Sequence, residues 1–225
     1  MGGYPSGQRG EAVNLLGVRP TWVQILPRPF LKIVIASNNE GKINEIKEFL
    51  KDIKEIELVS LKELNLKLEI DEFGKTLEEN ALIKARTVHY ITKLPVISDD
   101  SGLFIEALNG FPGIKSSDFQ KENKNYLEKI LKMMENEKNR KAYFKCVIVF
   151  IDSQSNEYIF YGEVLGEITY EVLGNNGFGY DPIFLYKPLG KTFAQIDIDI
   201  KNQISHRAKA LRKLKEFLIA SYIRN

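Results

Sequence analysis

The 225-residue sequence lacks most features that would place it outside the ordinary globular class. It has a single cysteine, Cys146, which excludes an intrachain disulfide and favours a reducing compartment such as the cytoplasm. No apolar run approaches the roughly 18 residues of a membrane span, so we expect a soluble protein without a membrane partner. With 44% hydrophobic and 28% charged residues, the composition is typical of a chain that buries a sizeable core.

An excess of charge of one sign is also missing. The formal net charge is +2, and residues 1–30 account for all of it, because residues 31–225 carry 29 basic and 29 acidic side chains. A neutral body is a poor counterion for a nucleic-acid backbone, so we expect no nucleic-acid partner.

Residues 1–30 differ from the rest of the chain. They hold four of the eight prolines and five of the sixteen glycines, without a sustained apolar period. They also lack the basic start and apolar core of a signal peptide, and a mitochondrial-type presequence is the weaker alternative. We therefore expect a non-native or disordered extension, followed by one domain over residues 31–225.

From Leu31 onward, strand-like and helix-like patterns alternate. Thr76 and Glu79 form a capping box at the start of one predicted helix, and Ser205 is placed to cap the last one. Strands separated by helices and followed by a long hairpin predict an α/β domain with a mixed sheet. The predicted strands are 31–37, 56–60, 95–98, 142–151 and 157–172, and the predicted helices are 42–51, 76–93, 120–135 and 205–222.

The stretch "ASNNEGK" (36–42) lies where a predicted strand turns into a helix. Free backbone N–H groups and the helix dipole attract anions at such a place. Gly41 permits close approach of a ligand to the backbone, and Lys42 adds a positive charge. The stretch is not a P-loop, because Ile43 stands where that motif needs a hydroxyl. An anion site and a plain helix start with a solvated lysine are equally compatible with these residues.

Two adjacent aspartates, Asp99 and Asp100, stand within "SDDSG" (98–102) after a short apolar run. Successive strand residues point to opposite faces, so both carboxylates cannot enter one core. At the carboxyl end of a strand they would face the crevice where α/β proteins bind ligands, and converging carboxylates suit Mg²⁺. Asp71 and Glu72 are candidates for a further ligand. A polar turn that simply ends the strand is the alternative, and in isolation it is favoured.

The segment "GNNGFGYDPIF" (174–184) is too apolar for a simple solvent loop. Phe178 and Tyr180 are candidates to stack on a flat ring, and Asp181 to accept hydrogen bonds from a base or sugar. A glycine-rich turn with aromatic side chains in the core has about equal weight.

The segment "KNQISHRAKAL" (201–211) places three basic side chains around the start of the last helix. Cations oppose the helix dipole there, by roughly 0.3–1 kcal/mol each, and a bound anion would offset that cost. Arg207 is suited to a bidentate bond with phosphate, and His206 to donate to an oxygen or a base. The other histidine, His89, lies in mid-helix, where a structural role is expected.

Together and in this order, these segments resemble the inosine triphosphate pyrophosphatase family, which acts on non-canonical purine nucleoside triphosphates such as dITP and XTP. The resemblance runs from Leu31 nearly to the C-terminus. It implies a long central mixed β-sheet with flanking helices that form two lobes around a substrate cleft, usually in a homodimer. It also implies Mg²⁺-dependent hydrolysis of ITP, dITP or XTP to the monophosphate and pyrophosphate. The matching stretches are "IASNNEGKINEI", "TLEENALIKA", "SDDSGLFIEALNGFPGI", "RKAYFKC", "GNNGFGYDPIF", "GKTFAQI" and "KNQISHRAKAL".

The resemblance also implies roles for individual residues. Asp100 would be the general base and a metal ligand, with Glu72 and Asp99 as further metal ligands. Residues 37–42 would hold the triphosphate, and residues 178–181 the base. The substrate-binding residues implied in this way are Ser37, Asn38, Asn39, Glu40, Gly41, Lys42, Ser101, Phe178, Gly179, Tyr180, Asp181, Lys201, His206 and Arg207.

The chain departs from the family pattern after "GFPGI". The family usually continues with Tyr-Ser-Ala-Arg and an aromatic, whereas "KSSDF" places Lys115 and Asp118 at the Tyr and Arg positions. Tyr126 stands where a lysine is common. An aspartate beside an anion site would lower affinity for a triphosphate, unless the usual arginine mainly braces the fold or the dimer. Two other functions stay open: hydrolysis of another modified nucleoside triphosphate on the same scaffold, and nucleotide or nucleic-acid binding without catalysis.

Overall fold

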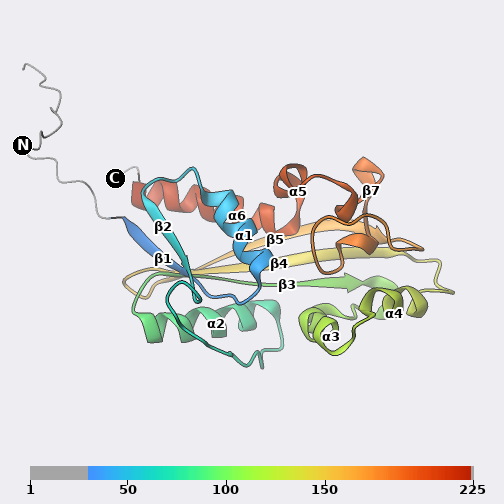
Figure 1. Ribbon diagram of the computed structural model, residues 1–225, viewed down its shortest axis with the longest axis horizontal. Coiled ribbons are helices and arrows are strands. Elements are labelled where there is room, and N and C mark those ends of the chain that lie inside the picture. Colours follow the sequence, from blue (N-terminus) through green and yellow to red (C-terminus); the bar gives the residue numbers. More distant parts are fainter. Residues whose placement is uncertain (1–29, 224–225) are drawn as a thin grey trace, which may run out of the picture.

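The computed structural model describes residues 30–223, which form an α/β domain around one seven-stranded mixed sheet (Figure 1). The proposed N-terminal extension therefore lies almost wholly outside the described residues. The strand order is β2-β1-β3-β4-β5-β6-β7. The strands are β1 (Leu31–Ile35), β2 (Ile56–Ser60), β3 (Val96–Ile105), β4 (Lys141–Ile151), β5 (Glu157–Ile168), β6 (Phe184–Tyr186) and β7 (Lys191–Thr192).

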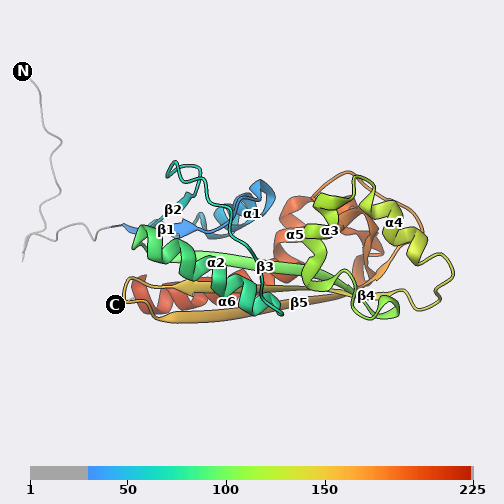
Figure 2. The ribbon, with the colours of Figure 1, turned by 90° about the horizontal axis from the view of Figure 1, so that it is seen from below.

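Helices flank the sheet on both faces (Figure 1 and Figure 2). They are α1 (Glu40–Leu50), α2 (Leu77–Thr92), α3 (Ser116–Glu122), α4 (Tyr126–Met133), α5 (Ile198–Ile204) and α6 (His206–Leu218), and short 3₁₀ turns lie after β3 and between β5 and α5. Within residues 30–223, no helix is both long enough and apolar enough to cross a membrane. The α/β class and the mixed sheet predicted from the sequence are thereby confirmed.

Each face of the sheet has its own hydrophobic core. The side chains of α1 and α6 pack with Ile33, Ile97 and Ile148 on one face. Helix α2 packs with Val34 and Val96 on the other face. A further cluster joins α4 and the 184–196 region to the far ends of the long strands, and Figure 1 shows α2 and α3 on the same side of the sheet.

The sheet changes character at β3, and this creates the place where the site forms. Strand β1 pairs with both β2 and β3 in parallel, but it contacts β3 only at Val96 and Ile97. Beyond Ile97, β3 continues antiparallel to β4 as far as Ile105. The segment 98–105 thus keeps β4 on one side and, among the described strands, has no partner on the other. We call this side the open edge of β3.

The prediction that the third strand ends at Ser98 is wrong. Asp99, Asp100 and Ser101 all lie in mid-strand, each opposite a residue of β4. Two other boundaries also differ. The helix predicted over 120–135 is divided into α3 and α4, and the long strand predicted over 157–172 ends at Ile168. The helix α5 and the short strands β6 and β7 were not predicted.

Candidate active site

The alternation of side chains along β3 distributes the acidic residues over both faces of the sheet. Asp99 points with Ile97 to the face that α1 and α6 cover, and Asp100 points to the face that α2 covers. Both carboxylates are buried, and each keeps one oxygen that has no hydrogen-bond partner among the described residues. Buried polar atoms without partners are rare in folded proteins, which marks both residues as candidates for function.

On the α2 face, Asp100 forms a cluster with Lys84 and Glu72. The ammonium group of Lys84 donates to Asp100 Oδ1 at 3.1 Å and to Glu72 Oε2 at 2.9 Å. Burial raises the pKa of Asp100 to about 6, with a further rise from Glu72 and an opposing effect from Lys84 and Lys42. Burial alone would lower the pKa of Lys84, but the charges of Asp100 and Glu72 outweigh it and raise this pKa.

The Asp100–Glu72 pair also suits a divalent cation. No group of three or more potential metal-ligating side chains is gathered anywhere in residues 30–223. Mg²⁺, however, is usually held by one or two carboxylates together with substrate phosphates and water. Here two carboxylates already share one cationic group, Lys84, and Asp100 Oδ2 is free to accept a ligand. These residues therefore fit Mg²⁺.

On the other face, Asp99 is held by two cations. Its Oδ2 atom lies 3.1 Å from Lys42 Nζ and accepts bonds from Arg207 Nε and Nη2, both at 3.2 Å. Burial alone would raise the pKa of Asp99, but Lys42, Arg207 and Lys84 together hold it well below its usual range. Arg207 also donates to Ser101 Oγ at 2.9 Å. Asp99 is thus the ion-pair partner of Lys42 and Arg207, on the face of the strand opposite Glu72 and Asp100.

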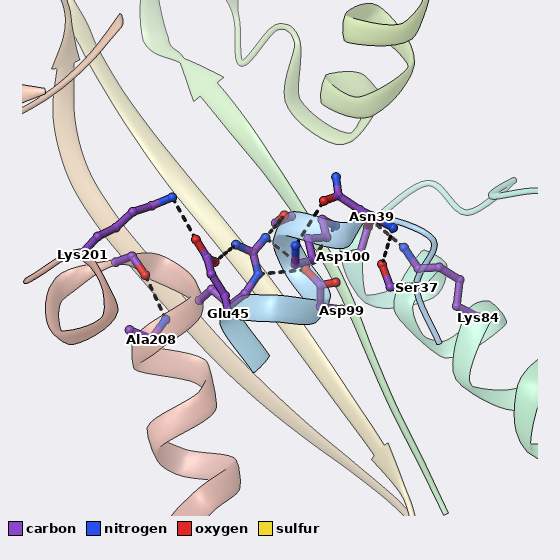
Figure 3. A network of polar contacts seen from close by, with 12 residues as sticks. Ser37, Asn39, Glu45, Lys84, Asp99, Asp100, Lys201 and Ala208 are labelled. Carbon is purple, nitrogen blue, oxygen red and sulfur yellow. Dashed lines mark hydrogen bonds and ion pairs between the residues drawn. The ribbon is translucent and has the colours of Figure 1, made fainter. Parts of the chain in front are cut away.

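Glu45, which sequence reasoning missed, lies beside Lys201 in Figure 3 and connects it to Arg207. It accepts from Lys201 Nζ at 2.9 Å and from Arg207 Nη1. Both cations are only 2% exposed. Burial alone would raise the pKa of Glu45, but the charges of Arg207 and Lys201 outweigh it and lower this pKa. Glu45 thereby holds two buried cations in one fixed arrangement.

The loop that carries Phe178 and Asp181 closes this cation cluster. Asp181 Oδ2 accepts from Lys201 Nζ at 2.6 Å and from the backbone N–H of Phe178 at 2.9 Å. The Phe178 ring lies 4.6 Å from Lys201 Nζ, a distance typical of a cation–π contact. A side chain at Gly41 would come within 2.7 Å of the same ring. Gly41 is therefore needed to leave room for the Phe178 ring, as well as for any close approach of a ligand to the backbone.

The anion-binding stretch predicted over 37–42 folds as the start of α1. Asn39 is the N-cap, and its side chain accepts from the N–H of Lys42 at 3.1 Å. Ser37 accepts from the N–H of Asn39 at 3.2 Å, and Asn38 donates to the Leu68 carbonyl at 2.8 Å. Glu40 is exposed and lies 3.4 Å from the exposed Lys62 ammonium group.

Lys42 stands at the open edge of β3 and links the two faces. It pairs with Asp99 on one face, and its positive charge also acts to lower the pKa of Asp100 on the other face. Arg207 and Asp100 therefore lie on opposite faces of one strand, yet the same lysine acts on the carboxylates of both faces. A ligand that wraps around this edge would meet both clusters.

His206 is buried against Phe144, with the two rings stacked at a centroid distance of 4.6 Å. Burial lowers its pKa well below the ordinary value, and the charges of Arg207 and Lys201 lower it further. Its Nδ1 atom has no partner among the described residues. At neutral pH the imidazole is therefore uncharged and offers one free nitrogen to a ligand.

The cleft between the Phe178 loop and α3 collects most of the residues that the sequence singled out. Its volume is about 60 Å³. Asp118 and Lys115 are exposed and do not line it. The Arg-to-Asp difference therefore places no carboxylate in the cleft. The lining residues are Asn39, Lys42, Ser101, Gly102, Leu103, Ser116, Ser117, Gln120, Phe144, Phe178, Gly179, Tyr180, Asp181, Lys201, His206 and Arg207.

Comparison with known proteins gives a consistent result. The model of the Ham1 family matches residues 33–217. A dITP/XTP pyrophosphatase of Caldanaerobacter subterraneus is 46% identical over 195 residues, which cover 84% of this chain and 96% of the relative. A HAM1 protein from Coxiella burnetii has a structure that matches with a TM-score of 0.78 at 40% identity, covering 85% of this chain and all of the other. The Staphylococcus aureus Ham1 protein matches with a TM-score of 0.75 at 42% identity, covering 84% of this chain and 98% of the other.

Proposed function

The chain belongs to the Ham1 family, and we propose that it hydrolyses non-canonical purine nucleoside triphosphates, such as ITP, dITP and XTP, to the monophosphate and pyrophosphate. The relatives named dITP/XTP pyrophosphatases support this substrate class. The single observation that carries the proposal is the gathering of Lys42, Asp99 and Asp100 at one open strand edge. Carboxylates and cations in that arrangement would bind both the base and the triphosphate of a nucleotide.

The two faces of β3 suggest separate binding regions for the base and for the triphosphate. The base would lie against Phe178 and Tyr180 in the cleft, where Lys201, Arg207 and neutral His206 offer hydrogen-bond donors and acceptors. The triphosphate would pass Lys42 at the open edge and reach the Asp100 cluster. Backbone N–H groups at the start of α1 would add further donors. Ser37 and Asn38 line a neighbouring hollow beside this helix start and would contact the outer phosphates.

In the hydrolysis step, Asp100 would act as the general base. Without a metal its pKa is about 6, so it is ionised at neutral pH, and as a carboxylate it would accept a proton from the attacking water. As the new P–O bond forms, the bond to the pyrophosphate leaving group breaks. Lys84 and Lys42 would stabilise the charge that develops on the phosphate oxygens.

We propose Mg²⁺ as the cofactor, held by Asp100 and Glu72. The charges of the site support it: Lys42, Lys84, Lys201 and Arg207 are already paired with five carboxylates, so little positive charge is left for a polyanionic triphosphate. When bound, Mg²⁺ would supply the missing positive charge and activate water. Asp99 is engaged by Lys42 and Arg207, and we assign it to positioning those cations. Its predicted part in metal binding stays a prediction.

Discrimination against ATP would come from the hydrogen-bonding groups in the cleft. Lys201 donates to two carboxylates and lies beside the Phe178 ring, where it would also donate to the 6-oxygen of a hypoxanthine or xanthine base. An amino group at that position would face a donor and leave a buried polar group unpaired. Such mismatches cost enough to reject the wrong base.

The defining experiment compares ITP, dITP, XTP, ATP and a modified UTP in the presence of Mg²⁺, with phosphate and pyrophosphate assayed separately. The proposal expects pyrophosphate from ITP or XTP at a kcat/KM on the order of 100-fold or more above that for ATP. Equal rates on all substrates would contradict it. A preference for the modified UTP would favour the alternative of a different modified nucleotide, and no turnover at all would favour a binding protein. Turnover that a chelator leaves intact would exclude the metal.

We also propose a cytoplasmic homodimer. Phe104 and Tyr143 stack at 5.2 Å on the α2 face, and Leu165 and Tyr161 on the neighbouring strand are 68% and 49% exposed. Lys145 and Glu163 form an ion pair on the same face, so the face offers both charges to a second copy of itself. Sedimentation should give twice the chain mass, and Leu165→Glu should shift it toward the monomer. A monomeric wild type would contradict this.

A further inference from the structure

Two tyrosine hydroxyl groups tie the Phe178 loop to the helices across the cleft. Tyr126, the first residue of α4, donates from its hydroxyl to the Gly179 carbonyl at 2.9 Å. Tyr180 donates to the Ser116 carbonyl at 2.8 Å. The rings of Tyr126 and Tyr180 meet edge to face at 5.2 Å. The loop and the α3–α4 segment are thus held together by a pair of reciprocal contacts.

The backbone at Gly179 needs such a restraint. Gly177 and Gly179 both have positive φ values, of 73° and 62°, and the segment from 174 to 180 has no regular hydrogen-bonded structure. Glycines at these positions give the backbone access to many other conformations. A hydrogen bond to the Gly179 carbonyl fixes the peptide plane between Gly179 and Tyr180. The position of Tyr180 depends directly on that plane, and Phe178 is connected to it through the backbone of Gly179.

The hydroxyl group of Tyr126 is suited to a permanent donor role. Burial raises its pKa, and the charges of Asp181 and Glu128 raise it further, so the group stays protonated. Tyr126 does not line the cleft itself. Any influence on a ligand therefore passes through Gly179, which does line it.

We propose that Tyr126 is a positioning residue for base recognition, which holds the Phe178–Tyr180 side of the cleft in its binding shape through the Gly179 carbonyl. This inference rests on the proposed function, because the base is the part of the substrate assigned to that side. Tyr126 is also a position at which this chain departs from the common lysine of the family pattern. Compared with a lysine, the tyrosine offers a hydrogen-bond donor and, in addition, a ring that packs on Tyr180.

The test is Tyr126→Phe, which removes one hydroxyl group and keeps the ring contact with Tyr180. Its matched control is Tyr222→Phe, because the Tyr222 hydroxyl donates to Asp152 at 3.2 Å in a cluster that does not line the cleft. For each variant we would measure kcat and KM for ITP, inhibition constants for the products IMP and pyrophosphate, and stability in urea. The two products separate the base side of the site from the phosphate side.

For Tyr126→Phe we expect KM for ITP and the inhibition constant for IMP to rise about five- to tenfold, as for loss of one hydrogen bond. The constant for pyrophosphate and kcat should stay within about twofold. Tyr222→Phe should change stability but none of the binding constants. A Tyr126→Lys variant, whose ammonium can donate to the same carbonyl, should bind IMP more tightly than Tyr126→Leu.

Three outcomes would overturn the inference. The first is a Tyr126→Phe enzyme with unchanged affinity for IMP. The second is an equal loss of affinity for IMP and pyrophosphate, which indicates general disruption. The third is equal IMP affinity in the lysine and leucine variants. A wild-type protein that does not hydrolyse ITP would instead refute the proposed function, and the two failures are therefore distinguishable.

Discussion

Replacing Asp100 with asparagine is expected to separate activity from stability. Asp100 is buried and accepts one hydrogen bond from Lys84, while its other oxygen has no partner among the described residues. Asparagine has almost the same shape but carries no charge and cannot accept a proton as a base. We expect hydrolysis of ITP to fall by about 10²–10⁴-fold, the usual contribution of general base catalysis.

The stability change follows from the pKa of Asp100. Burial raises this pKa from 3.8 to about 6 in the folded protein. The folded state therefore holds the proton more tightly than the unfolded chain, and stability falls as the pH rises from about 3.8 to about 6. At about 1.36 kcal/mol per pKa unit, the carboxylate costs at most about 3 kcal/mol above pH 6. The asparagine variant does not have this destabilisation. Its net gain in stability is reduced by any weakening of the contact with Lys84.

Urea unfolding of both proteins at pH 4 and pH 7.5, with a chelator present, measures the difference. The variant should be more stable than the wild type at pH 7.5, by up to about 3 kcal/mol, and nearly equal to it at pH 4. Pyrophosphate release from ITP with Mg²⁺ is measured in parallel. Turnover like the wild type would remove Asp100 from its role as base. A variant that is less stable at pH 7.5 would refute the argument from burial.

Two further substitutions test the neighbouring parts of the site. Lys84→Met leaves Asp100 and Glu72 without their shared cation and should destabilise the protein by about 3–5 kcal/mol at pH 7.5. The loss should shrink at pH 5, where Asp100 is protonated, and an equal loss at both pH values would contradict the pairing. Phe178→Ala should raise the inhibition constant for IMP tenfold or more, since stacking on a base is worth about 1–3 kcal/mol, without a matching change for pyrophosphate.

Most of the architecture was predictable because it depends on local patterns of apolar residues. Thr76 accepts from the N–H of Glu79 as the predicted capping box requires, but the Glu79 side chain accepts from the N–H of Lys75 and not from that of Thr76. The Ser205 cap forms as expected. The exception is β3, where "SDDSG" has the composition of a turn. Its polar side chains stay in the strand because distant residues pair with each of them: Lys42 and Arg207 with Asp99, Lys84 with Asp100, and the Ala81 carbonyl with Ser98. Such long-range partners leave no local signal.

The types of residue at the site were predictable, but their pairing was not. Lys84 and Glu45 were missed because a charged residue in an amphipathic helix is normally assigned to solvent. One signal was available for Lys84, which lies three residues after Ala81 and four before Val88, on the apolar stripe of α2. Glu45 is buried by contacts with residues more than 150 positions away. Its role depends on a packing arrangement that the sequence alone does not reveal.

The continuous backbone of β3 has a consequence for the substrate that the protein accepts. Neighbouring Cα atoms are about 3.8 Å apart in a trans chain, and β4 holds Asp99 and Asp100 from moving independently. Under the proposed function, the strand would hold the base-binding cleft and Asp100 at a fixed separation. This separation would select for the distance between the base and the α-phosphorus, which the sugar sets, and the number of phosphates beyond the bond that is cut would not change it.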